Sequence, residues 1–118
     1  MKELAIQYVG LDVHQATLAV SVRNQQGAVT MRATVATEAK AIVGLVRGLG
    51  GRVHLVFEEG TQAQWLHDVL KPHVERVTVC NLRGRGKLEN KSDRIDADRL
   101  SELLRDRSRA CITARARC

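Results

Sequence analysis

The chain has 118 residues, 44% of them hydrophobic, and a formal net charge of +6. This length and composition fit one domain with a modest core and argue against two. No apolar run approaches the length of a membrane span, and Met1-Lys2-Glu3 leads into strand-like sequence without a signal-peptide hydrophobic region. We therefore expect an intracellular, cytoplasmic protein with no membrane partner.

The basic excess belongs to the C-terminal third of the chain. Residues 1–81 hold eight Lys/Arg and seven Asp/Glu, whereas residues 82–118 hold eleven and six. Such asymmetry favours a polyanionic partner, most often nucleic acid, although a solvated basic surface is the simpler alternative. The three cysteines lack CxxC spacing, which argues against a disulfide framework or a zinc site.

Three strands are expected in the first third of the chain. A nearly continuous apolar run over residues 4–14, interrupted by Asp12, is typical of a strand covered on both faces. Strands over residues 16–23 and 28–35 follow, separated by the turn sequence Asn24-Gln25-Gln26-Gly27. The short connections predict an antiparallel meander.

Helices and strands alternate after this meander. Apolar residues recur at helical spacing from Ile42 to Leu49, with Thr37 as the expected N-cap and Gly50-Gly51 ending the pattern. The next expected elements are a strand over residues 53–57, a helix around residues 65–70 stopped by Pro72, and a strand over residues 76–80.

The last helix, predicted over residues 91–104, has two aspartates on its apolar side. At about 100° per residue, Asp93 and Asp96 fall inside the stripe formed by Ala97, Leu100, Leu103 and Leu104. The remaining polar residues are expected on the far side: Arg94, Asp98, Arg99, Ser101, Glu102 and Arg105.

Two explanations for these aspartates stay open. An N-cap at Ser92 or Asp93 would suit the start of a helix and accounts for Asp93. It accounts less well for Asp96, because a core-facing carboxylate is costly unless something positive or protonated meets it. The alternative is a metal or acid-base site.

The element order βββαβαβα predicts an α/β protein with the ribonuclease H-like fold, a mixed five-stranded sheet flanked by helices. Asp12 would lie in the central strand and Glu58 at the C-terminal end of the fourth. The last helix would bring Asp93 and Asp96 across the sheet, so these acids can converge where ligands of open α/β sheets gather. His14, two residues after Asp12, is the only histidine expected to line such a site.

Four carboxylates in one partly apolar pocket would repel one another strongly. Some must then be protonated, or divalent cations must neutralise them. Oxygen ligands favour Mg²⁺ or Mn²⁺ over zinc, and two such ions support phosphodiester chemistry. Beside a basic surface, this pattern indicates a nucleic-acid active site.

Three sequence motifs carry a family resemblance. They are Gly10-Leu11-Asp12-Val13, Glu58-Glu59-Gly60-Thr61 followed by Trp65-Leu66, and Lys91-Ser92-Asp93-Arg94-Ile95-Asp96-Ala97 before a leucine-rich helix. Together they resemble the N-terminal domain of the IS-one-ten family of insertion-sequence transposases, which shares a DEDD tetrad with the Holliday-junction resolvase RuvC and the Piv DNA invertase. The resemblance covers about residues 5–106, and we assign residues 1–106 to this RuvC-like domain.

By that resemblance, the catalytic and metal-binding tetrad is Asp12, Glu58, Asp93 and Asp96, holding Mg²⁺ or Mn²⁺. Glu59 competes for the second place, but strand alternation lets only one of the two glutamates face the site. We prefer Glu58, the first residue after the apolar run. Asp98 should be a surface residue.

The resemblance implies a bacterial protein for DNA transposition and recombination, associated with the nucleoid when bound to DNA. The intact family is guided by a structured RNA and is expected to act as a homo-oligomer. Contacts to phosphates are expected from Arg83, Arg85, Lys87, Lys91 and Arg94, for which a solvated loop is the alternative. Family members continue into a second, serine-containing domain, so we expect a truncated product whose residues 107–118 form a basic irregular tail.

Two other functional classes remain open. A stand-alone junction resolvase or nuclease would use the same carboxylates and cut branched DNA alone. A non-catalytic remnant would bind nucleic acid without chemistry. Full recombination by this chain is not expected in any of these cases, because the serine domain is absent.

Overall fold

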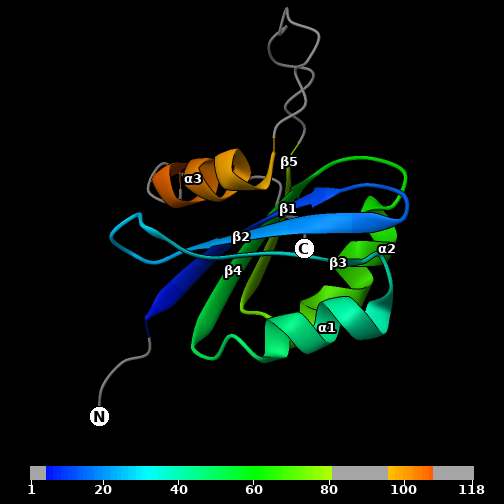
Figure 1. Ribbon diagram of the computed structural model, residues 1–118, viewed down its shortest axis with the longest axis horizontal. Coiled ribbons are helices and arrows are strands. Elements are labelled where there is room, and N and C mark those ends of the chain that lie inside the picture. Colours follow the sequence, from blue (N-terminus) through cyan, green and yellow to red (C-terminus); the bar gives the residue numbers. More distant parts are fainter. Residues whose placement is uncertain (1–4, 81–95, 108–118) are drawn as a thin grey trace, which may run out of the picture.

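A computed structural model describes residues 5–80 and 96–107, which form a mixed five-stranded sheet flanked by helices (Figure 1). The predicted α/β class with such a sheet is therefore confirmed. The strands are β1 (Ile6–Val13), β2 (Thr17–Arg23), β3 (Val29–Ala36), β4 (Arg52–Glu58) and β5 (Arg76–Cys80). The helices are α1 (Ala39–Arg47), α2 (Ala63–Leu70), the 3-10 helix η1 (Lys71–His73) and α3 (Ala97–Arg107).

Strand β1 lies at the centre of the sheet, whose order is β3-β2-β1-β4-β5. The β1–β2 and β2–β3 pairs are antiparallel, and the β1–β4 and β4–β5 pairs are parallel. This division follows from the connections, because tight turns can join only antiparallel neighbours whereas parallel neighbours need a crossover. At the β2–β3 turn, Asn24 Oδ1 accepts the amide hydrogens of Gln26 and Ala28 at 2.9 and 3.0 Å, and Gly27 takes a φ of 96°.

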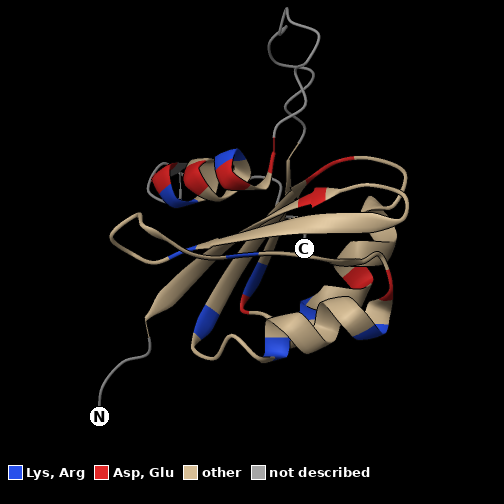
Figure 2. Ribbon diagram, in the orientation of Figure 1, with Lys and Arg blue, Asp and Glu red and all other residues tan. Residues whose placement is uncertain are grey.

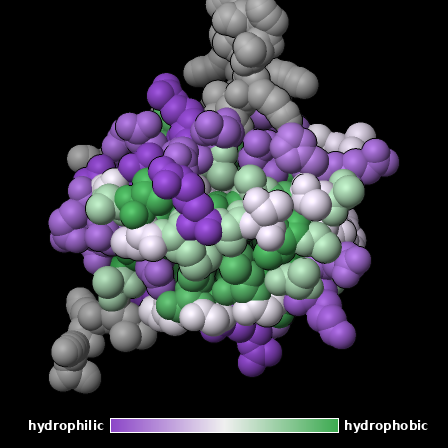
Figure 3. Space-filling model, viewed as in Figure 1, coloured by the Kyte–Doolittle hydropathy of each residue, from purple (hydrophilic) through white to green (hydrophobic). Residues whose placement is uncertain are grey.

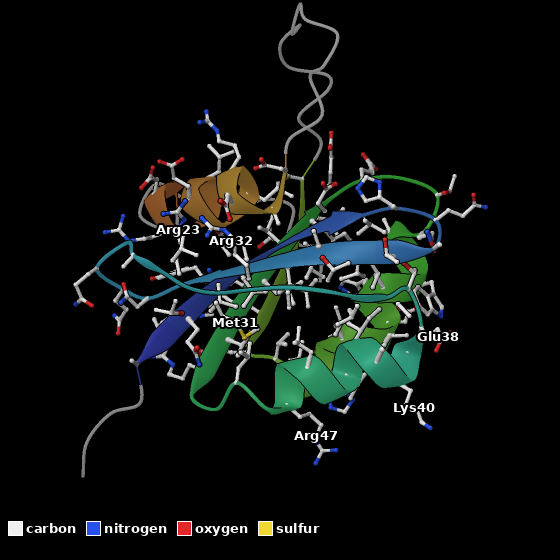
Figure 4. All side chains as sticks on the ribbon, viewed as in Figure 1. Arg23, Met31, Arg32, Glu38, Lys40 and Arg47 are labelled. Atoms are coloured by element: carbon white, nitrogen blue, oxygen red, sulfur yellow. The ribbon has the colours of Figure 1, made fainter. Side chains whose placement is uncertain are left out.

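The sheet separates two apolar cores, which explains the nearly continuous apolar sequence of β1. Val9 and Leu11 face the larger core under α1 and α2, whereas Tyr8 packs with Val56 and Leu100 under α3. Alternation along a strand therefore decides which core each residue meets. Figure 3 shows apolar side chains also reaching the surface on the side of β3 and α1, where Met31 lies (Figure 4).

Helix α1 begins without the cap expected from its sequence. Its N-cap residue is Glu38, which makes no side-chain capping hydrogen bond. The sequence predicts Thr37 as the cap, but the Thr37 hydroxyl instead donates to the His14 carbonyl oxygen at 3.0 Å. Thr37 thus fixes the β1–β2 connection. None of the described helices is long and apolar enough to cross a membrane.

Helix α3 packs unusually closely against β1. A Cβ atom placed on Gly10 would lie 2.5 Å from the Ala97 carbonyl oxygen and 2.6 Å from the Ser101 nitrogen. Ser101 is fully buried, so its predicted position on the solvent side of the helix is wrong. Its spacing explains this, since it lies four residues after Ala97 and three before Leu104, both buried.

Candidate functional site at the strand ends

Asp12 is the penultimate residue of the central strand β1. Alternation directs its side chain to the face that α3 covers, because Tyr8 lies on that face and Leu11 on the other. The side chain is 17% exposed, and its Oδ2 lies 3.3 Å from His14 Nε2. A mostly buried carboxylate thus stands at the C-terminal end of the central strand.

Glu58 occupies the matching position on the neighbouring parallel strand. It is the last residue of β4, and the β1–β4 register pairs Leu11 with Phe57, so Asp12 and Glu58 are the next positions along. Matched residues of parallel strands point to the same face, which puts both carboxylates on the α3 side. Glu58 is partly buried, whereas Glu59 is exposed and lies beyond the end of the strand.

Asp96 stands at the start of α3 and caps it. Its Oδ1 accepts the Arg99 backbone N–H at 2.9 Å, and its carbonyl oxygen accepts the Leu100 N–H at 3.0 Å. The prediction that the helix runs through Asp96 is therefore wrong, because Ala97 is its first residue. Capping occupies one oxygen of an exposed carboxylate, and Oδ2 accepts no hydrogen bond from the described residues.

His14 lies where the sequence suggested, beside Asp12. Its side chain is about half exposed, and its carbonyl oxygen accepts hydrogen bonds from Thr37 and, at 3.4 Å, from Gln62 Nε2. These two donors come from different parts of the chain. They hold the backbone at the start of the β1–β2 connection in place, and the imidazole extends from it beside the Asp12 carboxylate.

The fourth predicted acid, Asp93, and the predicted phosphate-binding cations lie outside the described residues: Arg83, Arg85, Lys87, Lys91 and Arg94. The ends of that segment are nevertheless placed. It leaves β5 after Cys80, which pairs with Glu58, and rejoins the described chain at Asp96. Cys80 ends the strand next to Glu58, whereas Asp96 immediately precedes α3.

Acidic residues mark the C-terminal ends of two strands in the described part of the chain. Figure 2 shows acidic segments at the C-terminal ends of β1 and β4 and at the start of α3, with basic segments on the start of β4 and on α1 toward the opposite end. Residues 5–80 and 96–107 contain ten Lys/Arg and ten Asp/Glu. The net charge of +6 therefore comes from the remaining residues, 1–4, 81–95 and 108–118.

No three His, Cys, Asp or Glu side chains within residues 5–80 and 96–107 form a group spaced to hold a metal ion. Three of the four acids proposed from the sequence are placed there. We call the strand-end region of Asp12, Glu58 and Asp96 the acidic edge. A divalent cation would need these side chains to turn inward, or further ligands.

Two polar residues at the α3 interface carry no signal in the sequence. Arg23 donates from Nε to Ser101 Oγ at 3.0 Å, and Arg32 donates from Nε to Asp98 Oδ1 at 3.0 Å. Asp98 is therefore not simply a surface residue, since its side chain is 37% exposed and bonded to the sheet. These pairs join residues more than 60 positions apart, so no local pattern indicates them.

Comparison with known proteins adds no assignment. No protein-family model matches this chain, and no curated protein matches it either.

Proposed function

We propose that this chain is a ribonuclease H-like, RuvC-like catalytic domain that carries out magnesium-dependent phosphodiester chemistry on DNA, as a transposase domain does. One observation carries the proposal: Asp12 and Glu58 occupy matched positions on adjacent parallel strands, on the face where α3 begins. Carboxylates at the C-terminal ends of parallel strands lie where open α/β sheets usually bind ligands. The motif order that resembles the IS-one-ten family adds the transposase identity.

In donor chemistry, these acids suit a hard divalent cation, although the described side chains are not yet spaced to hold one. Asp12, Glu58 and the second oxygen of Asp96 are oxygen ligands, the type that Mg²⁺ and Mn²⁺ prefer, and Asp93 would supply a further one. When bound, such ions lower the pKa of an attacking water and stabilise the leaving oxygen. Adjacent carboxylates without a cation would repel both one another and DNA phosphates.

The chain's own residues have three tasks in this scheme. The acidic edge holds the cations, the His14 imidazole beside Asp12 orients that carboxylate, and the cationic segment after Cys80 contacts the phosphate backbone. If these cations lie near the acids, they would offset the repulsion between the acids and DNA. A guide RNA and a homo-oligomer belong to the transposase interpretation through the family resemblance.

The test uses the complete 118-residue chain, supercoiled DNA and branched DNA with Mg²⁺, Mn²⁺ or a chelator. We expect slow metal-dependent nicking that Asp12→Asn and Glu58→Gln abolish. Glu59→Gln and Glu102→Gln are matched controls that remove an exposed carboxylate and should nick like the parent chain. Nicking that survives Asp12→Asn would refute the proposal, and efficient symmetrical cutting of junctions alone would favour a stand-alone resolvase.

A non-catalytic nucleic-acid-binding role is the second candidate. It is favoured by Asp96, whose carboxylate already has a structural task as the cap of α3. A purely structural site predicts DNA binding without metal-dependent nicking. It also predicts equal melting temperatures in Mg²⁺ and in chelator, whereas a cation at about a hundred times its Kd would stabilise the fold by about 2.7 kcal/mol.

A further inference from the structure

Strand β3 is an edge of the sheet, since only β2 pairs with it among the described residues. Figure 1 shows β3 at one side of the sheet, with α3 over one face and α1 over the other. An edge strand presents backbone groups that can pair with another chain, and proteins commonly protect such edges with proline, lysine or a very short strand. β3 runs for eight residues, VTMRATVA, without proline or lysine. Within the described residues, it is therefore open to a further strand.

The outward backbone groups of β3 belong to Arg32 and Thr34. Just after the strand, the Thr37 N–H donates to the Ala16 carbonyl oxygen, just before β2, at 2.9 Å. Hydrogen-bonding direction alternates along an antiparallel strand, so the backbone groups of Ala33 also face β2. The amide and carbonyl groups of its two neighbours, Arg32 and Thr34, then point away from the sheet.

The two faces of β3 differ in polarity. On the side of α1, three apolar side chains are only partly buried against the larger core: Met31, Ala33 and Val35. Figure 3 shows apolar surface in this region. On the side of α3, Arg32 is exposed, but its Nε and Nη2 lie 3.0 and 2.9 Å from the two carboxylate oxygens of Asp98, which offsets its charge. A partner strand should thus be apolar on one face and polar on the other, as β3 itself is.

A second copy of β3 meets these requirements when it pairs antiparallel about a two-fold axis at Ala33. In this register, Met31 lies opposite Val35 of the second copy, and Arg32 lies opposite Thr34 of the second copy. Residues 30–36 of the two copies overlap. The apolar pairs all lie on the α1 side, and the outward backbone groups of Arg32 and Thr34 face each other in hydrogen-bonding positions.

Neighbouring registers are less favourable. An axis at Arg32 gives an equally long overlap, over residues 29–35, but places two arginine side chains directly opposite each other, which destabilises a strand pair. An axis at Met31 or at Thr34 shortens the overlap to residues 29–33 or 32–36. An axis between two residues would set outward backbone groups against inward ones, so that no hydrogen bonds could form.

We propose that β3 is a docking edge for a second copy of this chain, so that the two sheets join into one across a two-fold axis at Ala33. The inference concerns assembly and does not depend on the metal-dependent chemistry proposed above. The family resemblance implies a homo-oligomer without naming a surface, and β3 supplies a surface of defined geometry. A contact made by one strand of each copy is small, so the dimer should be weak.

Sedimentation equilibrium of the complete chain measures the Kd of this dimer, with a reducing agent present so that the three cysteines form no disulfide. The mass should rise with protein concentration from 13.1 kDa towards twice that value. Thr34→Pro removes an outward N–H without removing a hydrogen bond to β2, so it should abolish the dimer and keep the circular dichroism spectrum. Thr34→Lys leaves the backbone unaltered and places two cations opposite each other, twice per dimer, so the Kd should rise roughly 2- to 30-fold.

Thr30→Lys is the matched control, because it adds the same charge to the same exposed face of β3 but lies opposite Ala36 of the second copy. It should leave the Kd unchanged. Thr34→Glu places an acid opposite Arg32 and should lower the Kd. Hydrogen exchange adds a direct observation of the edge, since the Arg32 and Thr34 amides should exchange quickly in dilute protein and more slowly in concentrated protein.

Four results would overturn the proposal. The first is a chain that stays monomeric up to a concentration on the order of 1 mM. The second is slow exchange of the Arg32 and Thr34 amides in dilute, monomeric protein, since the edge would then be covered within the chain. The third is a dimer with the same Kd in Thr34→Lys as in the parent, which would use another surface. The fourth is equal weakening by Thr30→Lys and Thr34→Lys, which excludes the axis at Ala33.

Discussion

Replacing Gly10 by alanine tests how α3 is held, because it adds one methyl group at the closest approach of helix and strand. The new Cβ would meet the Ala97 carbonyl oxygen at 2.5 Å and the Ser101 nitrogen at 2.6 Å. Both are backbone atoms, so no side-chain rotation relieves the overlap. The helix must retreat by roughly 1 Å to reach the ordinary van der Waals separation of packed atoms, or it must leave the sheet.

The magnitudes indicate which of these happens. Overpacking of this kind costs about 1–3 kcal/mol, whereas exposing Leu100 and Leu104 would cost roughly 1.5–3 kcal/mol for each side chain. Strain is therefore cheaper than undocking, and we expect a shifted but bound helix. A loss of about 1–3 kcal/mol corresponds to a fall in Tm of roughly 4–12 °C for a domain of this size.

Thermal unfolding followed by circular dichroism gives the Tm, and hydrogen exchange at the α3 amides reports docking. Gly44→Ala is the control, since a Cβ there meets nothing within 4 Å and alanine favours the interior of α1 by up to about 1 kcal/mol. It should melt at or above the parent temperature. A Tm for Gly10→Ala indistinguishable from the parent, with unchanged exchange in α3, would refute the close-approach reasoning.

Three further outcomes are expected. Arg32 lowers the pKa of Asp98 in the folded protein below 3.8. The pair therefore contributes its full stability at pH values well above 3.8, and this stability is lost as the pH falls through the folded-state pKa of Asp98. Asp98→Asn should remove this part of the dependence of Tm on acidic pH. Burial, with a smaller effect of Arg76, lowers the pKa of His54 below 6.5, so stability should fall as the pH drops below 6.5, and His54→Leu should flatten that fall in the same melts. DNA binding should be weak and indifferent to sequence. Alanine at the five predicted phosphate-binding cations should reduce the slope of log K against log salt concentration by about 0.9 for each phosphate that is no longer neutralised. An unchanged slope would assign DNA binding to other residues.

The sheet could be predicted because burial leaves a direct mark on strand sequence. Residues 4–14 have the pattern of a strand covered on both faces, and β1 does lie between two cores. The antiparallel pairing that short connections require is equally local. The position of α3 across the sheet is harder to predict, since it depends on Gly10, whose signal is only that a glycine interrupts an apolar strand.

The start of α3 is difficult to place from sequence because several residues in succession can cap a helix. Ser92, Asp93 and Asp96 all have side chains suited to that role, and sequence alone cannot rank them. The structure places the cap at Asp96. Ser101 is misplaced by the sequence pattern for a different reason: polarity suggests exposure, although the spacing of this residue puts it on the buried side.

The cap at Asp96 and its proposed role as a cation ligand are compatible, and the geometry of a carboxylate explains why. One oxygen accepts the Arg99 N–H at 2.9 Å, which leaves the other oxygen for a second partner. A helix N-terminus carries a positive partial charge, which weakens the attraction of a capping carboxylate for a cation. Asp12 and Glu58 lie in strands, whose net dipoles are small, so they should supply most of the affinity. Asp96 should then contribute mainly geometry, so its position would matter more to the proposed chemistry than its charge.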